Sequence, residues 1–251
     1  MPMFAVTDVS MLALVGLGAL LAGFTTGFSG FGTGLVASGI WFFVLPAEMV
    51  PPLIALASVT GQIAGIITTR KSFNWMDTRP YLAGGIIGVP LGVLALSAIS
   101  PFALRTFMGV LLIGYASFQL LRRIPEKVST KDTGLMDGMI GIIGGFLGGF
   151  AGLSGPAPLI WLQLKGGSND SQRAIYQPFN FIVLMLASLG MFASGEMTRS
   201  VMEIALICLP ATLLGSFIGA RCYIGVSAQS FQRIVLTLLL ASGCILFVQS
   251  F

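Results

Sequence analysis

Apolar segments about as long as a membrane is thick follow one another along almost the whole chain. The longest of them, Met11–Leu45, contains no charged side chain. A helix needs about 20 apolar residues to cross the hydrocarbon core of a bilayer. The pattern therefore predicts a bundle of membrane-spanning helices joined by short loops.

The segments fall into two groups, each made of one longer interrupted segment followed by three spans. The interrupted segments are Met11–Leu45 and Leu135–Leu164, which are too long for one crossing and rather short for two. The predicted spans are Val50–Thr69, Tyr81–Ile99 and Phe102–Leu121, then Pro178–Ser194, Val201–Gly219 and Ser230–Val248. We expect an all-α polytopic membrane protein in which each interrupted segment is a re-entrant helix pair.

Glycines and small hydroxyls interrupt the two longer segments near their centres. The first interruption is GFSGFGTG, Gly27 to Gly34, and the second is GLSGPAP, Gly152 to Pro158. Closely spaced glycine and proline break a continuous helix, and irregular backbone at membrane depth persists only where protein or a cavity covers it. Broken helices at corresponding positions are the best sequence signal of a transporter's binding site.

Other glycines recur at four-residue spacing, which is typical of closely packed membrane helices. The two runs interpreted in this way are Gly84, Gly88 and Gly92, and Gly144, Gly148 and Gly152.

The two groups also resemble each other in sequence. Gly88–Leu112 aligns with Gly215–Leu239 at a constant shift, and Ser29-Gly30 aligns with Ser154-Gly155 at nearly the same shift. We therefore expect two transmembrane repeats, residues 1–123 and 134–251, joined by a polar cytoplasmic linker, residues 124–133.

The distribution of Lys and Arg predicts that the second repeat is inverted. If each interrupted segment enters the membrane and returns, eleven cations fall on one face and two, Arg105 and Arg199, on the other. Single crossings would divide them eight against five. Cytoplasmic loops are enriched in Lys and Arg, so we expect re-entrant pairs and both termini outside the cytoplasm of a bacterial inner membrane.

The composition is that of a chain with little surface for water. Of its 251 residues, 55% are hydrophobic and 9% are charged, whereas a soluble domain carries about 25% charged residues. We expect no additional soluble domain. We also expect no cleaved signal peptide, because Met1–Thr69 contains no Lys or Arg and so lacks a basic start.

The interruptions have the chemistry of an anion site. A helix that restarts after Gly30 or Gly155 presents free N–H groups and the positive end of its dipole. All nine Asp and Glu residues fall in loops or near span ends, where none can hold Na⁺ at mid-membrane. The substrate-binding residues we expect are Ser29, Gly30, Phe31, Gly32, Thr33, Gln62, Ser154, Gly155, Pro156, Gln177 and Asn180.

Some of these residues have a structural alternative. Buried amides such as Gln62, Gln177 and Asn180 often tie helices together. Arg105 is interpreted either as a guide for anions into the pore or as a snorkelling cation, and Arg173 as a cation that sets the topology. The three cysteines have no metal-ligand spacing, and we expect neither a metal nor a cofactor.

These motifs, in this order, resemble the TauE/SafE sulfite-exporter family of bacterial membrane proteins. The resemblance covers nearly the whole chain and rests on GFTTGFSGFGTGLV, LPAEMVPPLIALAS, GIIGVPLG…LRTFMGVLL, GGFLGGFAGLSGPAP, QRAIYQPFN and FQRIVLTLLLASG. It implies transport, by expectation export, of small sulfur-containing anions: sulfite, sulfoacetate or other organosulfonates. A histidine often found in the family after the first proline pair is absent, since Leu53 follows Pro51-Pro52.

We therefore expect alternating access around a central anion site, with a small anionic substrate and the lipid bilayer as partners and no nucleic acid. A homodimer is left open. An anion channel and a non-transporting structural membrane protein are the alternatives. An enzyme is disfavoured because the chain has no histidine and no mid-membrane carboxylate.

Overall fold

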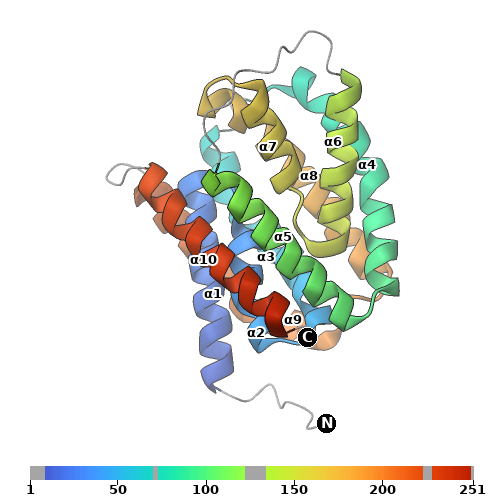
Figure 1. Ribbon diagram of the computed structural model, residues 1–251, viewed down its shortest axis with the longest axis vertical. Coiled ribbons are helices and arrows are strands. Elements are labelled where there is room, and N and C mark those ends of the chain that lie inside the picture. Colours follow the sequence, from blue (N-terminus) through green and yellow to red (C-terminus); the bar gives the residue numbers. More distant parts are fainter. Residues whose placement is uncertain (1–8, 70–72, 122–133, 223–227, 250–251) are drawn as a thin grey trace.

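The computed structural model describes residues 9–69, 73–121, 134–222 and 228–249, which form α-helices and no strand (Figure 1). The first half contains α1 (Val9–Ser29), α2 (Thr33–Val44), the short η1 (Ala47–Met49), α3 (Val50–Thr69), α4 (Trp75–Ala98) and α5 (Pro101–Leu121). The second contains α6 (Gly134–Ala151), α7 (Pro156–Lys165), α8 (Asn169–Ala193), α9 (Arg199–Cys222) and α10 (Ala228–Gln249). The predicted linker, residues 124–133, lies outside the described residues.

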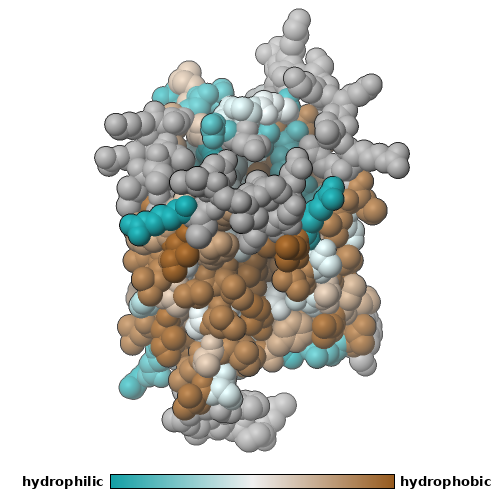
Figure 2. All heavy atoms as spheres, turned by 90° about the vertical axis from the view of Figure 1, so that its left-hand side faces the viewer, coloured by the Kyte–Doolittle hydropathy of each residue, from teal (hydrophilic) through white to brown (hydrophobic). Residues whose placement is uncertain are grey.

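The surface of the bundle suits a lipid environment. Among the described residues, six helices are long and apolar enough to cross a membrane: α1, α4, α5, α6, α8 and α9. Large apolar side chains point outward from them, such as Leu94 and Leu206, which are 67% and 76% exposed. Figure 2 shows a broad hydrophobic band with hydrophilic residues toward its two ends. The predicted all-α polytopic membrane fold is confirmed.

Each interrupted segment is a helical hairpin. α2 folds back along α1, and the Trp41 indole N–H donates to the Val15 carbonyl oxygen at 3.1 Å. α7 folds back along α6 in the same way, and the Trp161 indole N–H donates to the Asp137 carboxylate at 2.6 Å. Each interrupted segment is therefore a pair of helices broken near its centre, as predicted; that the pairs are re-entrant in the membrane stays a prediction.

The non-helical backbone within each hairpin is shorter than the sequence suggested. It is confined to residues 30–32 and 152–155. Gly30 and Gly152 have φ angles of 84° and 71°, a region that residues with a side chain rarely adopt. Gly27, which the sequence pattern placed in the interruption, lies inside α1, where its hydrogen atoms face α9 rather than a turn.

Glycine packs α4 directly against α6. A Cβ on Gly84, Gly88 or Gly92 would overlap a backbone carbonyl oxygen of α6. The predicted packing role of this run is thus confirmed. The facing glycines are Gly141, Gly145 and Gly149, each of which lies against a carbonyl oxygen of α4.

α1 and α9 pack in the same manner. Gly23 and Gly27 of α1 lie against backbone of α9, and Gly215 and Gly219 of α9 lie against backbone of α1. In both pairs the contacts advance together along the two helices, so the partners run parallel. Such close approach of small residues drives helix association inside membranes.

The other predicted glycine run has a different role. Gly144 and Gly148 lie on the face of α6 that turns toward the second hairpin and α8, where Ser154 and Val183 fill the space beside them. Gly152 is in the turn itself. The four-residue spacing therefore correctly predicted close packing. The glycines of α6 that meet α4, however, include Gly145 and Gly149, each one residue after a member of the predicted run.

Two further pairs of helices cross the middle of the molecule in antiparallel fashion. α5 and α10 lie side by side and run in opposite directions (Figure 1), with Gly109 of α5 against Gly243 and Phe247 of α10. α3 and α8 also run antiparallel at the centre. α1 begins and α10 ends at the same end of the bundle (Figure 1).

Two helices begin earlier than predicted because polar residues cap them. The Asn74 side chain accepts the Asp77 backbone N–H at 3.2 Å, so α4 begins at Trp75 instead of Tyr81. Ser168 caps α8 in the same way, and this helix therefore contains Pro178 instead of beginning at it. As a result Gln177 and Asn180 lie in the middle of α8, and the start of the span lies two turns before them.

Candidate functional site

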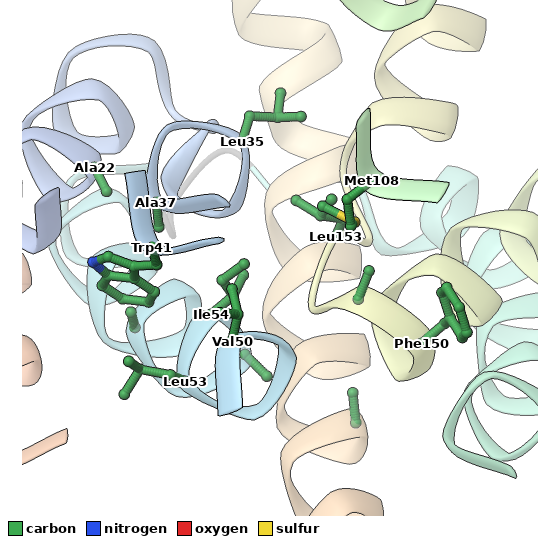
Figure 3. Close-up of a cluster of buried hydrophobic side chains, with 14 of the residues drawn as sticks. Ala22, Leu35, Ala37, Trp41, Val50, Leu53, Ile54, Met108, Phe150 and Leu153 are labelled. Atoms are coloured by element: carbon green, nitrogen blue, oxygen red, sulfur yellow. The ribbon is translucent and has the colours of Figure 1, made fainter. Parts of the chain in front are cut away.

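The turns of the two hairpins meet at the centre of the bundle. A Cβ on Gly34, in the first turn of α2, would overlap the Leu153 side chain and lie 3.2 Å from the Gly152 carbonyl oxygen. Leu153 and Ile54 of α3 belong to the buried cluster between the hairpins that Figure 3 shows. Glycine at these positions is what lets two stretches of irregular backbone approach each other.

A cavity of about 30 Å³ lies between the two turns, which is room for one or two water molecules. It is lined by residues 31–35 of the first hairpin, 152–156 of the second, Ser58 and Gln62 of α3, and Asn180 and Leu184 of α8. None of these lining residues is acidic. Of the predicted binding residues, those brought together here are Phe31, Gly32, Thr33, Gln62, Ser154, Gly155, Pro156 and Asn180.

On the first side of the cavity, α2 begins without a side-chain cap among the described residues. Gly32 stands at the cap position with a φ of 108°, and Val36 is the first residue whose N–H bonds back, to the Gly32 carbonyl oxygen at 3.0 Å. The N–H groups of residues 33–35 precede it and remain available as donors. The Thr33 hydroxyl is hydrogen-bonded to the hydroxyl of Thr26 on α1.

On the second side, α7 also begins without a described side-chain cap, but it offers fewer donors. Pro156 and Pro158 have no N–H, so only Ala157 can donate from the first turn before the Leu159 N–H bonds to the Gly155 carbonyl oxygen at 3.0 Å. The expectation of free N–H groups at both restarts therefore applies fully to α2 alone.

Side chains complete the second wall. The Ser154 hydroxyl donates to the Asn180 amide oxygen at 3.1 Å, and both residues are buried. A Cβ on Gly155 would lie 3.3 Å from the Asn180 amide nitrogen. The amide of α8 is thus held against the second turn and borders the cavity at the same time.

Two buried oxygen atoms near the cavity have no hydrogen-bond partner among the described residues. They belong to the Gln62 side-chain amide and to the Thr212 hydroxyl of α9. Thr212 lies beside Gly61, as does the Thr33 hydroxyl. Buried polar atoms are normally paired, so this corner has the character of a site for a ligand or water. The sequence analysis did not single out Thr212, one of two hydroxyl-bearing residues in the apolar span Val201–Gly219.

Three predicted residues lie behind the first turn and do not line the cavity. The Ser29 hydroxyl lies 2.7 Å from both the Thr25 and the Phe31 carbonyl oxygens and can donate to either, and so closes the end of α1. Gly30 is covered by α8, and the Gln177 amide nitrogen would lie 3.0 Å from a Cβ placed on it.

Of the two arginines considered in the sequence analysis, Arg173 and not Arg105 lies beside a hairpin turn. Arg105 is exposed on α5 and is not one of the described residues that line the cavity; its guiding role stays a prediction. Arg173, interpreted as a topology cation, reaches the first turn from α8, where its guanidinium donates to the Phe28 carbonyl oxygen at 3.2 Å. The regular spacing of Arg173, Gln177 and Asn180 was the signal that could have revealed it.

Among the described residues, one acidic side chain is buried, and it accepts hydrogen bonds from three donors. Asp137, in the first turn of α6, accepts from Tyr81 at 2.7 Å, from Trp161 and from Lys165. It ties the open end of the second hairpin to α4, away from the central cavity. No group of three or more Cys, Asp or Glu residues in the described part of the chain is placed to hold a metal ion.

Comparison with known proteins decides the family. The family model for the sulfite exporter TauE/SafE matches residues 15–246. The chain belongs to this family. A relative from Cupriavidus necator, named probable sulfite/organosulfonate exporter TauE, is 23% identical over 242 residues, which cover 93% of each chain. No solved structure matches this TauE/SafE protein. Membership makes it a multi-pass membrane transporter and not an enzyme.

Proposed function

We propose that this TauE/SafE protein exports small sulfur-containing anions, such as sulfite or short organosulfonates, across a bacterial plasma membrane. The observation that carries the proposal is the meeting of two broken helices around one polar cavity at the centre of a membrane bundle. Irregular backbone at that depth is expected only where it lines a cavity or is buried in protein. The name of the Cupriavidus necator relative supports the choice of anion.

The donors around the cavity suit an oxyanion. The uncapped start of α2 offers three backbone N–H groups and the positive end of the helix dipole. Asn180 adds amide N–H groups and Thr33 a hydroxyl, and the Ser154 O–H can join them by turning from the Asn180 oxygen to the anion. The Gln62 amide can also present its NH₂ group, because rotation of an amide by 180° exchanges oxygen and nitrogen.

The packing supports alternating access by two inverted repeats. Each hairpin is bound through glycine to a helix of the other half, α1 to α9 and α6 to α4. Corresponding central helices, α3 with α8 and α5 with α10, run antiparallel, as inverted copies require. We propose that α1–α3 with α9 form one moving body and α6–α8 with α4 the other, and that they slide along the α3–α8 contact.

The membrane potential is sufficient to drive export. Moving one negative charge outward from a negative interior releases about 2.3 kcal/mol per 100 mV, and a dianion releases about twice as much. None of the described residues that line the cavity is a carboxylate that could couple transport to Na⁺ or protons. The export direction therefore follows from the charge of the substrate.

Counterflow in proteoliposomes tests the proposal. Vesicles are loaded with sulfite, and entry of labelled sulfite is followed for wild type and for Thr33→Val with Ser154→Ala. We expect saturable uptake that internal sulfite accelerates, with a half-saturating concentration at least tenfold higher in the double variant, since each lost hydrogen bond to a charged group costs about 1.5–3 kcal/mol.

Thr237→Val is the matched control, because this exposed threonine on α10 bonds only along its own helix, to the Arg233 carbonyl oxygen at 2.9 Å. Flux that ignores internal sulfite would indicate a channel instead of a carrier. Absence of anion flux under any gradient would reject the proposed transport of these substrates.

A further inference from the structure

One face of α8 connects the first hairpin to the central cavity. Arg173, Tyr176, Gln177 and Asn180 are spaced at i, i+3, i+4 and i+7, so they share this face. Asn180 borders the cavity and the second turn. Arg173, one turn after the start of α8, lies on the side of the cavity that the charge distribution predicts to be cytoplasmic.

Three polar side-chain atoms converge on Gly30 from this face. A Cβ on Gly30 would lie 2.7 Å from the Tyr176 hydroxyl, 3.0 Å from the Gln177 amide nitrogen and 3.1 Å from Arg173 Nε. The missing side chain is therefore what admits the guanidinium to the first turn. The turn itself continues directly into Phe31 and Gly32, which line the cavity.

Two hydrogen bonds join this group to neutral acceptors at the end of α1. Arg173 donates to the Phe28 carbonyl oxygen and Tyr176 to the Ser29 carbonyl oxygen, both at 3.2 Å. A guanidinium forms stronger and shorter hydrogen bonds with an oxyanion than with a carbonyl group, and its planar fork matches two oxygens of one group. An anion that reaches the first turn can thus displace the Phe28 carbonyl as the partner of Arg173.

We propose that Arg173 is a specificity-determining residue that binds the anion directly on the cytoplasmic side of the cavity. It selects oxyanions that carry at least two terminal oxygens on one atom and passes them along α8 toward Asn180 and the start of α2. This inference rests on the proposed function, because it assigns a residue to the transport of the same anions.

The test is to measure sulfite counterflow and thermal unfolding for Arg173→Gln and Arg173→Lys. We expect Arg173→Gln to raise the half-saturating sulfite concentration at least tenfold and to abolish the rise in Tm that sulfite causes in detergent. Arg173→Lys keeps the charge but loses the fork, and its half-saturating concentration should lie between those of wild type and Arg173→Gln. Arg233→Gln, a change to an exposed arginine on α10, should match wild type.

Tyr176→Phe separates binding from helix capping. It removes a cap on the same end of α1 and one neighbour of the Arg173 side chain, but it keeps the charge and the fork of the guanidinium. Any rise in the half-saturating concentration should therefore be much smaller than that of Arg173→Gln. If Arg173 only caps α1, Arg173→Gln will lower the Tm of the ligand-free protein, leave the half-saturating concentration unchanged and resemble Tyr176→Phe, which would overturn the inference. Should Arg173→Gln fail to fold, an unchanged half-saturating concentration in Arg173→Lys overturns it equally. Absence of flux in wild type would instead contradict the proposed function.

Discussion

Gln62 and Thr212 each bury an oxygen atom that has no hydrogen-bond partner among the described residues. Such an atom destabilises a folded protein by about 1–3 kcal/mol. Gln62, on α3, lines the central cavity, and Thr212, on α9, lies beside Gly61, the residue before Gln62. Single residues close to the meeting point of the two hairpins therefore carry buried polar atoms that the described part of the fold leaves unpaired.

Gln62→Leu should therefore separate binding from stability. Leucine of similar volume removes the unpaired oxygen, so the Tm of the ligand-free protein in detergent should stay the same or rise. The half-saturating sulfite concentration in counterflow should increase several-fold, because a donor to the anion is lost. A clear fall in Tm with unaltered transport would show that this amide is a tie between helices instead.

Of the residues that line the central cavity, those that stand out most clearly in the sequence break an apolar segment. Gly32, Thr33 and Ser154 stand out because small polar residues in a membrane helix need a reason to be there. Arg173 was missed although its spacing to Gln177 and Asn180 is a local signal, because the start of α8 was placed too late. Thr212 could not be placed, because its position depends on how α9 packs against α1. That contact joins distant parts of the chain, which a local pattern does not record.

At the scale of elements, the hairpin turns combine unusual backbone angles with very close packing. Gly152 has a φ of 71°, and a Cβ on it would lie 2.9 Å from the Ala55 nitrogen and 2.9 Å from the Pro51 carbonyl oxygen. The turn thus fits against the start of α3 only without a side chain. In this conformation, the turn therefore packs directly against the backbone of α3.

Gly152→Ala should therefore destabilise the protein by about 2 kcal/mol or more, since the left-handed conformation alone costs about 1–2 kcal/mol for a residue with a side chain. The measurement is Tm in detergent. Gly114→Ala on α5 is the matched control: no described atom lies within 4 Å of its Cβ position, and alanine favours a helix over glycine by about 1 kcal/mol. Equal Tm changes in the two variants would contradict this account of the turn.

The start of α8 shows that a capping residue can be overlooked when helix ends are located from the apolar pattern alone. The start of α8 at Asn169 follows from the Ser168 cap, yet the polar residues after it and Pro178 made the span look as though it began later. Proline inside a membrane helix is tolerated where neighbours satisfy the freed backbone. Capping residues deserve more weight than proline in locating helix ends of this kind.

At the scale of the whole molecule, the two halves of the sequence are interlocked. α4 of the first half is bound through glycine to α6 of the second, and α9 of the second to α1 of the first. The sequence predicted two similar halves but not this exchange, although glycines at four-residue spacing are present on all four helices. The pairing of these glycine-bearing helix faces is set by tertiary packing and is not visible in the spacing along one helix.

Cross-links test the two moving bodies. In a variant without native cysteines, Val93→Cys with Gly190→Cys joins α4 and α8 within one body, where Val93 Cβ lies 3.9 Å from the Cβ position on Gly190, a separation that suits a disulfide. Transport should persist when it forms. Ser58→Cys with Leu184→Cys, joined by a short thiol-reactive linker across the cavity, should stop transport, and reduction should restore it. Retained transport with α3 and α8 linked would contradict the proposed sliding.

The prolines at the start of α7 imply that the two faces of the transporter are not equivalent. If the two repeats were identical and swapped conformations between the inward-open and outward-open states, both states would bind the anion with equal affinity. Pro156 and Pro158 leave that hairpin with one backbone donor in its first turn, where α2 has three. Under the proposed alternating access, the anion is therefore held less tightly whenever the second hairpin carries most of the contact. The half-saturating concentrations on the two faces should then differ, while the gradient and the membrane potential still set the direction of net transport.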